Sequence, residues 1–213
     1  MNTIIIDYGS GNLHSALKSF QKVANINNKG SVQVSDNPEV IKNADRIVLP
    51  GVGSFNDCMA GLVSKTDLIP ILKKRVLNDG IPFLGICVGL QLLADIGHEN
   101  EANSPGLGWV SGNVKRITPS NYAFRVPHIG WNSLVFDKTH HLVEGLPRLI
   151  DMYFVHSYHL DLKNEDDRVA YVHYSSKITA LVAKGNVAGS QFHPEKSQAA
   201  GQKFIENFLF WNP

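Results

Sequence analysis

The sequence lacks the features of secreted, disulfide-rich or membrane proteins. Its 213 residues include only two cysteines, Cys58 and Cys87, which cannot form a disulfide framework and contain no CxxC metal-binding pair. No apolar run approaches membrane-spanning length. The apolar stretch near the N-terminus is closed by Asp7 and is too short for a signal peptide. We therefore expect a cytosolic protein that does not enter a membrane.

An excess of charge of one sign is also missing. The chain has 20 Lys and Arg residues against 19 Asp and Glu residues, a formal net charge of +1, without a basic or acidic block. Nucleic-acid binding therefore has no electrostatic support. The 9 histidines show no HExxH or similar spacing, so no metal site is expected. With 43% hydrophobic and 18% charged residues, the composition is typical of a single globular domain, which we expect to span residues 1–213.

Strand and helix patterns alternate in the first half of the chain, and strand patterns dominate the second half. A further helical pattern closes the chain. This order predicts a three-layer α/β/α fold around a mixed, mostly parallel sheet, of flavodoxin-like type. In the first half, strands are predicted at 3–7, 31–35, 44–50 and 81–87, and helices at 13–24, 56–79 (broken at Pro70) and 88–97. The charged segment KNEDDR (163–168) is interpreted as a solvated turn between strands.

The stretch FLGICVGLQLL places Cys87 between Gly85 and Gly89, where an apolar strand ends and a helix is expected to begin. A G-x-C-x-G turn of this kind would lift the sulfur out of the sheet, as a nucleophile elbow does. The helix N-terminus would favour the thiolate, and the Val88 amide would point toward an oxyanion. A buried cysteine in a tight packing corner has the same pattern, so the pentapeptide alone leaves both interpretations open.

A cysteine nucleophile needs a base, and the segment QFHPEKS offers His193 at a strand end. Pro194 stops the strand there because it has no amide to donate. Glu195 lies on the same side as His193 in an extended segment, so its carboxylate could orient the imidazole. A surface turn could carry the same tripeptide. The other histidines are interpreted as structural or exposed, with His156 the one that also falls at a strand end.

A second glycine loop, LPGVGSF, also follows a strand. Gly51 and Gly53 permit backbone conformations that other residues avoid, and such a loop can offer amides to a developing oxyanion. The loop lacks the Lys-Ser/Thr pair of a phosphate loop, which argues against nucleotide binding. An ordinary strand-to-helix turn is the alternative interpretation.

Taken together, PGVGSF, GICVGLQLL and QFHPEKS resemble the three signatures of class I, triad-type glutamine amidotransferases. Three further stretches, DYGSGNLHS, PHIGWN and YFVHSY, are similar to one branch of that family, the glutaminase subunits of imidazole glycerol phosphate synthase in histidine biosynthesis. The resemblance covers nearly the whole chain. One conservative departure is Val88-Gly89-Leu90, where relatives often carry Leu-Gly-Met.

The resemblance implies particular roles for residues of this chain. Cys87 would be the nucleophile, His193 the base and acid, and Glu195 the orienting carboxylate. The other implied roles are an oxyanion hole of Gly51, Val52, Gly53 and Val88, a substrate site of Gln91, Ser157 and Tyr158, and a partner interface that includes Trp131 and Lys196.

The resemblance also implies a reaction and a partner. Glutamine would be hydrolysed to glutamate and ammonia through a glutamyl thioester, without a metal or organic cofactor. The ammonia would pass into a (β/α)₈-barrel cyclase subunit, bound as a heterodimer, which makes imidazole glycerol phosphate and aminoimidazole carboxamide ribotide. The alternatives are the glutaminase subunit of anthranilate, aminodeoxychorismate, guanylate or pyridoxal phosphate synthesis, a cysteine hydrolase or peptidase on the same scaffold, or a non-catalytic binding subunit.

Overall fold

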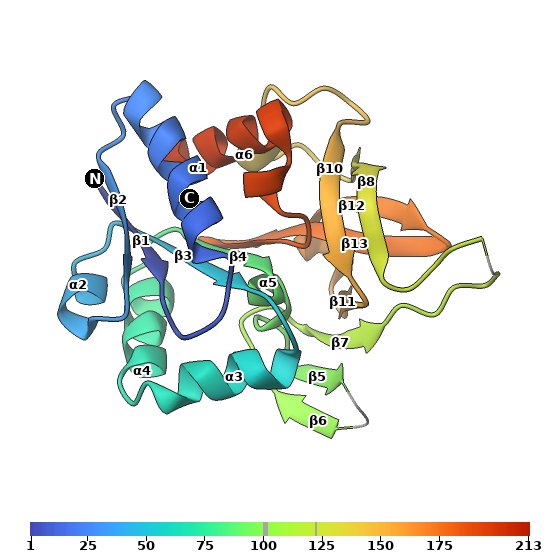
Figure 1. The fold of residues 1–213 in the computed structure, drawn as a ribbon, viewed down its shortest axis with the longest axis horizontal. Helices are drawn as coiled ribbons and strands as arrows, with labels where there is room; N and C mark the ends of the chain where they lie inside the picture. The colour runs from blue at the N-terminus through green and yellow to red at the C-terminus, as the bar shows by residue number, and fades with distance from the viewer. Residues whose placement is uncertain (100–101, 122) are drawn as a thin grey trace.

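The computed structural model describes residues 1–99, 102–121 and 123–213, and an eight-stranded sheet forms the centre of this part of the chain (Figure 1). The first five strands in spatial order are mutually parallel, and the last three are antiparallel to their neighbours. In that order the strands are β2 (Ser31–Ser35), β1 (Asn2–Ile6), β3 (Arg46–Gly51), β4 (Phe83–Cys87), β14 (Val187–Ser190), β13 (Ser176–Lys184), β12 (Arg168–Tyr174) and β9 (Val135–Phe136).

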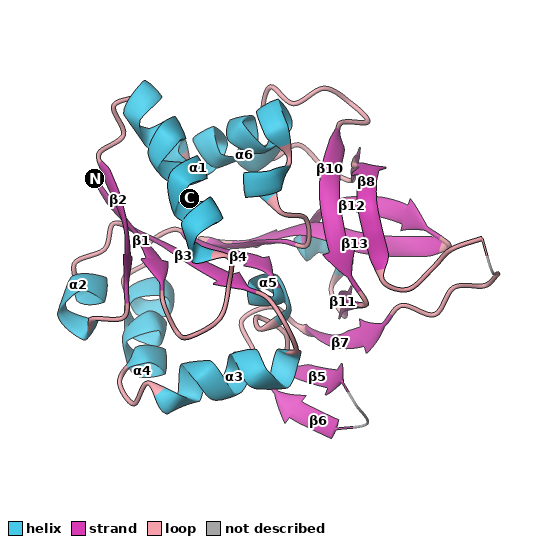
Figure 2. Cartoon of the chain, in the orientation of Figure 1, coloured by secondary structure: helices cyan, strands magenta, loops and turns pink. Residues whose placement is uncertain are grey.

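Helices cover both faces of this sheet (Figure 2), which confirms the predicted three-layer α/β/α fold with its mixed, mostly parallel sheet. One face carries α1 (Leu13–Ile26) and α6 (Gln198–Phe210), which meet through an edge-to-face contact of Phe20 and Phe208. The helices of the other face are α2 (Pro38–Lys42), α3 (Phe55–Ser64), α4 (Leu68–Lys73) and the short α5 (Val88–Gln91). In the described residues, no helix combines the length and apolarity that a membrane crossing requires.

Two smaller sheets accompany the large one, one at the right of Figure 1 and one at its lower centre. One is an antiparallel pair of β8 (His128–Ser133) and β10 (Asp151–His156). The other contains β11 (Tyr158–Leu162), β7 (Gly112–Arg116), β5 (Ile96–Glu99) and β6 (Ala102–Pro105). The remaining short helical turns are η1 (Lys74–Asn78), η2 (His141–Val143), η3 (Glu165–Asp167) and η4 (Pro194–Lys196).

The parallel strands bring three separate chain segments to one edge of the sheet. Gly51 at the end of β3 pairs with Cys87 at the end of β4, and Ser190 of β14 pairs with Ile86 of β4. The loops that follow these strands therefore emerge side by side, at the carboxyl ends where open α/β sheets bind their ligands. The register of the strands thus places residues 51–53, 87–88 and 191–193 around one point.

The expected helix over 88–97 is wrong beyond its first turn. Helix α5 ends at Gln91, and Gly97 lies in β5. A longer helix would need the carbonyls of Leu92 and Leu93 as internal acceptors. Those carbonyls instead accept hydrogen bonds from the backbone amides of residues 107, 109 and 110, which cross over this turn. Tertiary hydrogen bonds therefore override a locally helical pattern.

The predicted break at Pro70 is also wrong. The helical region breaks at residues 65–67, between α3 and α4, and Pro70 lies in the first turn of α4. Proline is tolerated at that position because the first amides of a helix have no acceptor within it.

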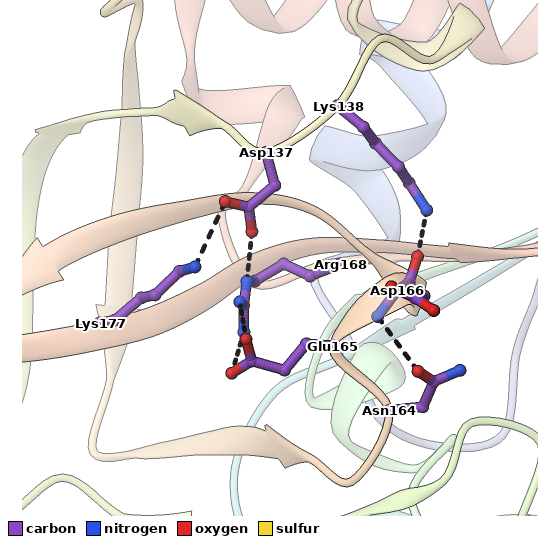
Figure 3. A network of polar contacts seen from close by, with 7 residues as sticks. All are labelled: Asp137, Lys138, Asn164, Glu165, Asp166, Arg168 and Lys177. Atoms are coloured by element: carbon purple, nitrogen blue, oxygen red, sulfur yellow. Dashed lines mark hydrogen bonds and ion pairs between the residues drawn. The ribbon is translucent and has the colours of Figure 1, made fainter.

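The predicted solvated turn at 163–168 is only partly exposed. It joins β11 to β12 as expected, but the side chain of Arg168 is 6% exposed and pairs with Glu165 at 2.9 Å and with Asp137 (Figure 3). Asp137 also pairs with Lys177 at 3.2 Å. The charged residues thus connect β12, β13 and the segment after β9 at the antiparallel edge of the large sheet.

A buried arginine connects β3 to the C-terminal end of the chain. Arg46 is 6% exposed, and its guanidinium donates hydrogen bonds to the carbonyls of Phe208 at 3.2 Å and Trp211 at 2.7 Å, and to Asn212 Oδ1 at 2.9 Å. Carbonyls at the end of a helix have no partner within it, and a cation there also interacts favourably with the helix dipole. Arg46 therefore holds the end of α6 against the sheet.

We predict that Arg46→Met lowers the free energy of unfolding by about 2–4 kcal/mol, because buried carbonyls lose charged donors. Urea denaturation followed by tryptophan fluorescence measures the effect. Arg148→Met, at an exposed position, is the matched control and should change the stability by less than about 0.5 kcal/mol. Equal stabilities of the two variants would refute the anchoring role of Arg46.

Candidate active site

The backbone at Cys87 adopts the sharp turn that an elbow requires. Its φ is +55° and its ψ −110°, a conformation that is strained for any residue with a side chain. The flanking glycines are needed for this turn. A Cβ atom on Gly85 would lie 2.4 Å from the Gly89 carbonyl oxygen, and one on Gly89 would lie 1.9 Å from the Leu49 carbonyl oxygen. Side chains at these positions would push β4, α5 and β3 apart.

Cys87 lines a cavity of about 330 Å³ at the carboxyl ends of the parallel strands. The thiol is nearly buried, with Cys87 4% exposed. Most of the predicted site residues converge on this cavity, whereas Gly51 and Glu195 do not line it directly. The predicted residues that do so are Val52, Gly53, Cys87, Val88, Gln91, Ser157, Tyr158 and His193.

His193 and Glu195 form a buried pair beside the cavity. The two atoms His193 Nδ1 and Glu195 Oε1 are 2.8 Å apart, and each side chain is 3% exposed. Because the carboxylate accepts, Nδ1 carries the proton in this pair. The other ring nitrogen, Nε2, is buried and has no hydrogen-bond partner within the described residues. Nε2 is therefore free to exchange a proton with a group in the cavity.

The surroundings of His193 favour its protonated form. Burial lowers the pKa of His193, but the nearby Cys87 sulfur and the hydrogen-bonded Glu195 carboxylate raise it by more. The pKa of His193 therefore lies above its ordinary value. An imidazolium favours a negative charge on a neighbouring sulfur.

Sequence reasoning missed Gln191, although it lies in the quoted segment QFHPEKS. Its side chain is fully buried, and Nε2 donates to Cys87 Sγ at 3.7 Å. Its Oε1 accepts from Gln91 Nε2 at 3.0 Å, and the same nitrogen of Gln91 donates to the Tyr158 carbonyl at 2.9 Å. The available signal was the i, i+2 spacing of Gln191 and His193, which places both on one side of an extended segment.

Two buried histidines form a pair at the cavity: His156 lines it, and His128 lies next to His156. His156 Nδ1 donates to the Tyr158 carbonyl at 2.8 Å, and His156 Nε2 lies 3.0 Å from His128 Nδ1. Burial lowers the pKa of His156 to about 3 and that of His128 to about 4. Both rings are therefore neutral near neutral pH. The sequence singled out His156 as a strand-end residue but gave no sign of its pairing with His128.

The amides predicted for the oxyanion hole differ in whether they already have a hydrogen-bond partner. Val88 begins α5 directly after Cys87, so its amide belongs to a helix N-terminus beside the sulfur. The Val52 amide donates to Ser10 Oγ at 3.3 Å, while Ser10 Oγ and Cys58 Sγ both donate to the Val52 carbonyl, at 2.7 and 3.4 Å. The second cysteine, Cys58, is thus buried in α3 and holds the glycine loop.

The residues predicted for the partner interface share one face beside the cavity. Trp131 of β8 is 48% exposed and packs edge-to-face on Tyr153 of β10, with ring centroids 5.9 Å apart. The ammonium of Lys196 in η4 lies 5.8 Å from the centroid of the same ring. Ile129, which is 60% exposed, adds apolar surface to β8. The tyrosine ring therefore brings Trp131 and Lys196 together.

Other parts of the molecule offer less for catalysis. A larger groove of about 1140 Å³ is lined by residues between 134 and 149, and none of the predicted site residues lies in it. Residues 1–99, 102–121 and 123–213 contain no group of three or more His, Cys, Asp or Glu side chains placed to hold a metal ion. The small cavity at Cys87 is therefore the candidate active site.

Comparison with known proteins gives a consistent result. The family described as glutamine amidotransferase class-I matches residues 4–211. The chain is 50% identical to imidazole glycerol phosphate synthase subunit HisH of Ruegeria pomeroyi and 46% identical to that of Cereibacter sphaeroides, covering 100% of each protein in both cases. Among solved structures, it is similar to one titled glutamine amidotransferase (TM-score 0.70, 18% identity, covering 96% of this chain and 98% of the other). It is also similar to PurLQS from Thermotoga maritima (TM-score 0.69, 19% identity, covering 98% and 97%). The family match over nearly the whole chain shows that this protein belongs to the class-I glutamine amidotransferases.

Proposed function

We propose that the chain is the glutaminase subunit of an imidazole glycerol phosphate synthase, with Cys87, His193 and Glu195 as its catalytic triad. The observation that carries the proposal is the strained turn at Cys87, which opens into the same cavity as the free Nε2 of a His193–Glu195 pair. The full-length identity to proteins named HisH supports the choice of this subunit.

In the proposed reaction, the Cys87 thiolate attacks the side-chain amide carbon of glutamine. The imidazolium of His193 gives its Nε2 proton to the leaving nitrogen, so that ammonia departs rather than an amide anion. A glutamyl thioester remains on Cys87. His193, now neutral, takes a proton from water as the water attacks the thioester, and glutamate is released. Glu195 keeps the proton on Nδ1 throughout and stabilises the imidazolium.

The cavity suits a substrate as small as glutamine. Its volume of about 330 Å³ is at the lower end of ligand sites. Gln91, Ser157 and Tyr158 line it, as does the carboxylate of Glu99, which can attract an ammonium group. Both N–H groups of Gln91 are engaged within the protein, which leaves its Oε1 as the atom for a substrate contact. The narrow space disfavours the alternative of a peptidase, which must admit a polypeptide.

The proposed oxyanion hole combines the Val88 amide with the loop of Gly51, Val52 and Gly53. The amide of Val52 is hydrogen-bonded to Ser10 in this structure, so it has to leave Ser10 before it can donate to an oxyanion. The Val88 amide needs no such change, because it lies at the start of α5.

The released ammonia requires a protected path, because in bulk water at neutral pH it would be protonated and lose its nucleophilicity. We propose that a (β/α)₈-barrel cyclase covers the face of Trp131 and Lys196 and receives the ammonia. Tryptophan and other aromatic residues are enriched in such interfaces.

A single domain and a cytosolic location are part of this proposal. Cytosolic conditions keep Cys87 as the free thiol that the reaction needs.

Other amidotransferase subunits are the main alternative, because they would share the triad. The structural neighbours do not decide between them, since identities of 18–19% establish the fold alone. The choice depends on the HisH relatives and on the segments DYGSGN and PHIGWN. Stimulation of glutamine hydrolysis by the cyclase and its nucleotide, but not by another synthase, would support the choice.

The first prediction is that Cys87→Ala abolishes glutamine-dependent turnover, by at least about a thousandfold, because no thioester can form. The measurement is product formation by the complex with the cyclase, with glutamine as nitrogen donor. Turnover with added ammonium salt is the internal control and should be retained. Full glutaminase activity of Cys87→Ala would show that the nucleophile is wrongly assigned.

A second prediction concerns the members of the triad as a unit. His193→Ala should reduce kcat as strongly as Cys87→Ala, and combining the two changes should cost little more, because groups that act together are non-additive. Glu195→Gln should be milder, since an amide oxygen can still accept from Nδ1. Steady-state kinetics of the three variants test this. Wild-type activity of the His193→Ala variant would show that His193 is not the base of the reaction.

A third prediction concerns the partner face. Trp131→Ala should weaken cyclase binding by about tenfold or more, because exposed aromatic residues often dominate such interfaces. Isothermal titration calorimetry with the cyclase measures the affinity. Ile26→Ala is the matched control, because Ile26 on α1 is 67% exposed and apolar but lies outside this face. Equal affinities of the two variants would place the interface elsewhere.

A further inference from the structure

The geometry points to Gln191 as a further catalytic residue: we propose that its side-chain amide stabilises the Cys87 thiolate by a hydrogen bond. A chain of hydrogen bonds that begins in β8 holds this amide in place. The inference rests on the proposed function, because it concerns the same nucleophile. Nε2 of Gln191 lies 3.7 Å from Cys87 Sγ, within the distance for a nitrogen donor to sulfur.

The orientation of the Gln191 amide follows from its neighbours. The Tyr158 carbonyl can only accept, so the Gln91 atom 2.9 Å from it must be the NH₂ group. That group reaches Gln191 at 3.0 Å, where it requires an acceptor. Oε1 of Gln191 must therefore face Gln91, and its NH₂ group must face the sulfur. The opposite orientation would leave a buried N–H of Gln91 without an acceptor and place an oxygen against the thiolate.

The tautomers of the two buried histidines can be assigned by the same argument, from Tyr158 outward to β8. Because His156 Nδ1 donates to the Tyr158 carbonyl, the neutral ring has only Nε2 left as an acceptor. His128 must then donate from Nδ1, at 3.0 Å, and accept at Nε2 from the side-chain amide of Asn132, at 3.3 Å. Each ring thus has a single tautomer that satisfies all contacts. The Tyr158 carbonyl is the point where the chain from β8 meets Gln91.

Burial makes this arrangement rigid. Gln191 has no exposed surface, and its backbone amide donates to the Ala180 carbonyl of β13 at 2.8 Å. His128 is held between two rings, with its centroid 3.9 Å from that of Tyr174 and 5.0 Å from that of Phe154. Hydrogen bonds in such a low-dielectric interior are stronger than in water, so each contact of the chain holds its neighbours in one orientation. The donor is therefore already in place before the thiolate forms.

The role of Gln191 differs from that of the titratable groups around the sulfur. The effect of His193 on the sulfur depends on whether the imidazole is protonated. The amide of Gln191 does not titrate, so it favours the thiolate whether His193 is protonated or neutral. It therefore adds to the stabilisation that the His193 imidazolium provides before the attack, and again when the thiolate leaves the thioester.

The test is the rate at which iodoacetamide alkylates Cys87, read by mass spectrometry of the Cys87 peptide so that Cys58 does not contribute. In Gln191→Met, which keeps the volume but has no donor, the sulfur loses a hydrogen bond that favours its thiolate, and the greater nucleophilicity of a more basic sulfur offsets part of this loss. The rate at neutral pH should therefore fall by about three- to fivefold. At strongly alkaline pH, where every thiol is ionised, it should equal or exceed the wild-type rate.

Further variants separate the donor from packing. Gln191→Glu keeps the shape and the acceptor toward Gln91 but places a carboxylate oxygen against the sulfur, so it should slow neutral-pH alkylation at least as much as Gln191→Met. Gln21→Met is the matched control, since Gln21 donates to the Val32 carbonyl at 3.1 Å in a different part of the fold, and it should react like wild type. A Gln191→Glu variant with the wild-type profile, or a Gln191→Met variant slowed equally at all pH values, would overturn the proposal.

His128→Phe tests the outer part of the chain, because it keeps the stacked ring and removes the donor to His156. As a single substitution, His128→Phe should slow neutral-pH alkylation of Cys87, as Gln191→Met does, but by a smaller factor. In the Gln191→Met background its effect should vanish, because it acts through Gln191. Independent, multiplicative effects would refute the chain.

Iodoacetamide needs no glutamine, so the alkylation results do not depend on the proposed function. The proposed function fails if wild type releases no ammonia from glutamine with the cyclase and its nucleotide present.

Discussion

The site depends on the close contact between the turn at Cys87 and the end of β3. Gly89 packs so tightly on the Leu49 carbonyl that no side chain fits between them, and Cys87 is held in a strained conformation as a result. Such strain persists only where the surrounding structure outweighs it. Here the parallel register of β3, β4 and β14 provides that support. The packing of the parallel strands therefore fixes the position of the Cys87 sulfur.

A second consequence of the same register is the polar interior of the site. β14 leads directly into Gln191 and His193, so an amide and an imidazole reach the sulfur from one segment. Buried polar groups are costly unless they are satisfied. The amides of Gln91 and Gln191 and the neutral pair of His128 and His156 satisfy one another in a continuous chain. One exception is Nε2 of His193, which has no partner among the described residues and is the atom that the proposed reaction uses.

The site and the proposed partner face are two sides of one small sheet. In β8 and β10, His128 and His156 lie on the buried side, whereas Trp131 and Tyr153 form part of the exposed surface. Pro127, immediately before β8, lines the cavity itself. A protein bound on this face would therefore rest on the strand whose inner residues hold the amides beside the sulfur. This short physical connection suits an enzyme whose product must leave toward a partner.

The sequence by itself determined the class of fold, and it predicted the side chains on which the proposed reaction depends. Both depend on local patterns such as apolar strands and glycines that permit a sharp turn. The pairing of His193 with Glu195 was expected from an extended segment, but Pro194–Lys196 forms the 3-10 turn η4, and the pair forms across that turn. Only the tertiary structure decided what lies around them. It ended α5 at Gln91 because the carbonyls that follow are taken by residues 107–110, and it turned Gln191 toward the sulfur through a carbonyl from a distant strand. Hydrogen bonds between segments far apart in the chain produce no periodic pattern in the sequence. They can therefore be identified only from the tertiary structure, in which the register of the strands is known.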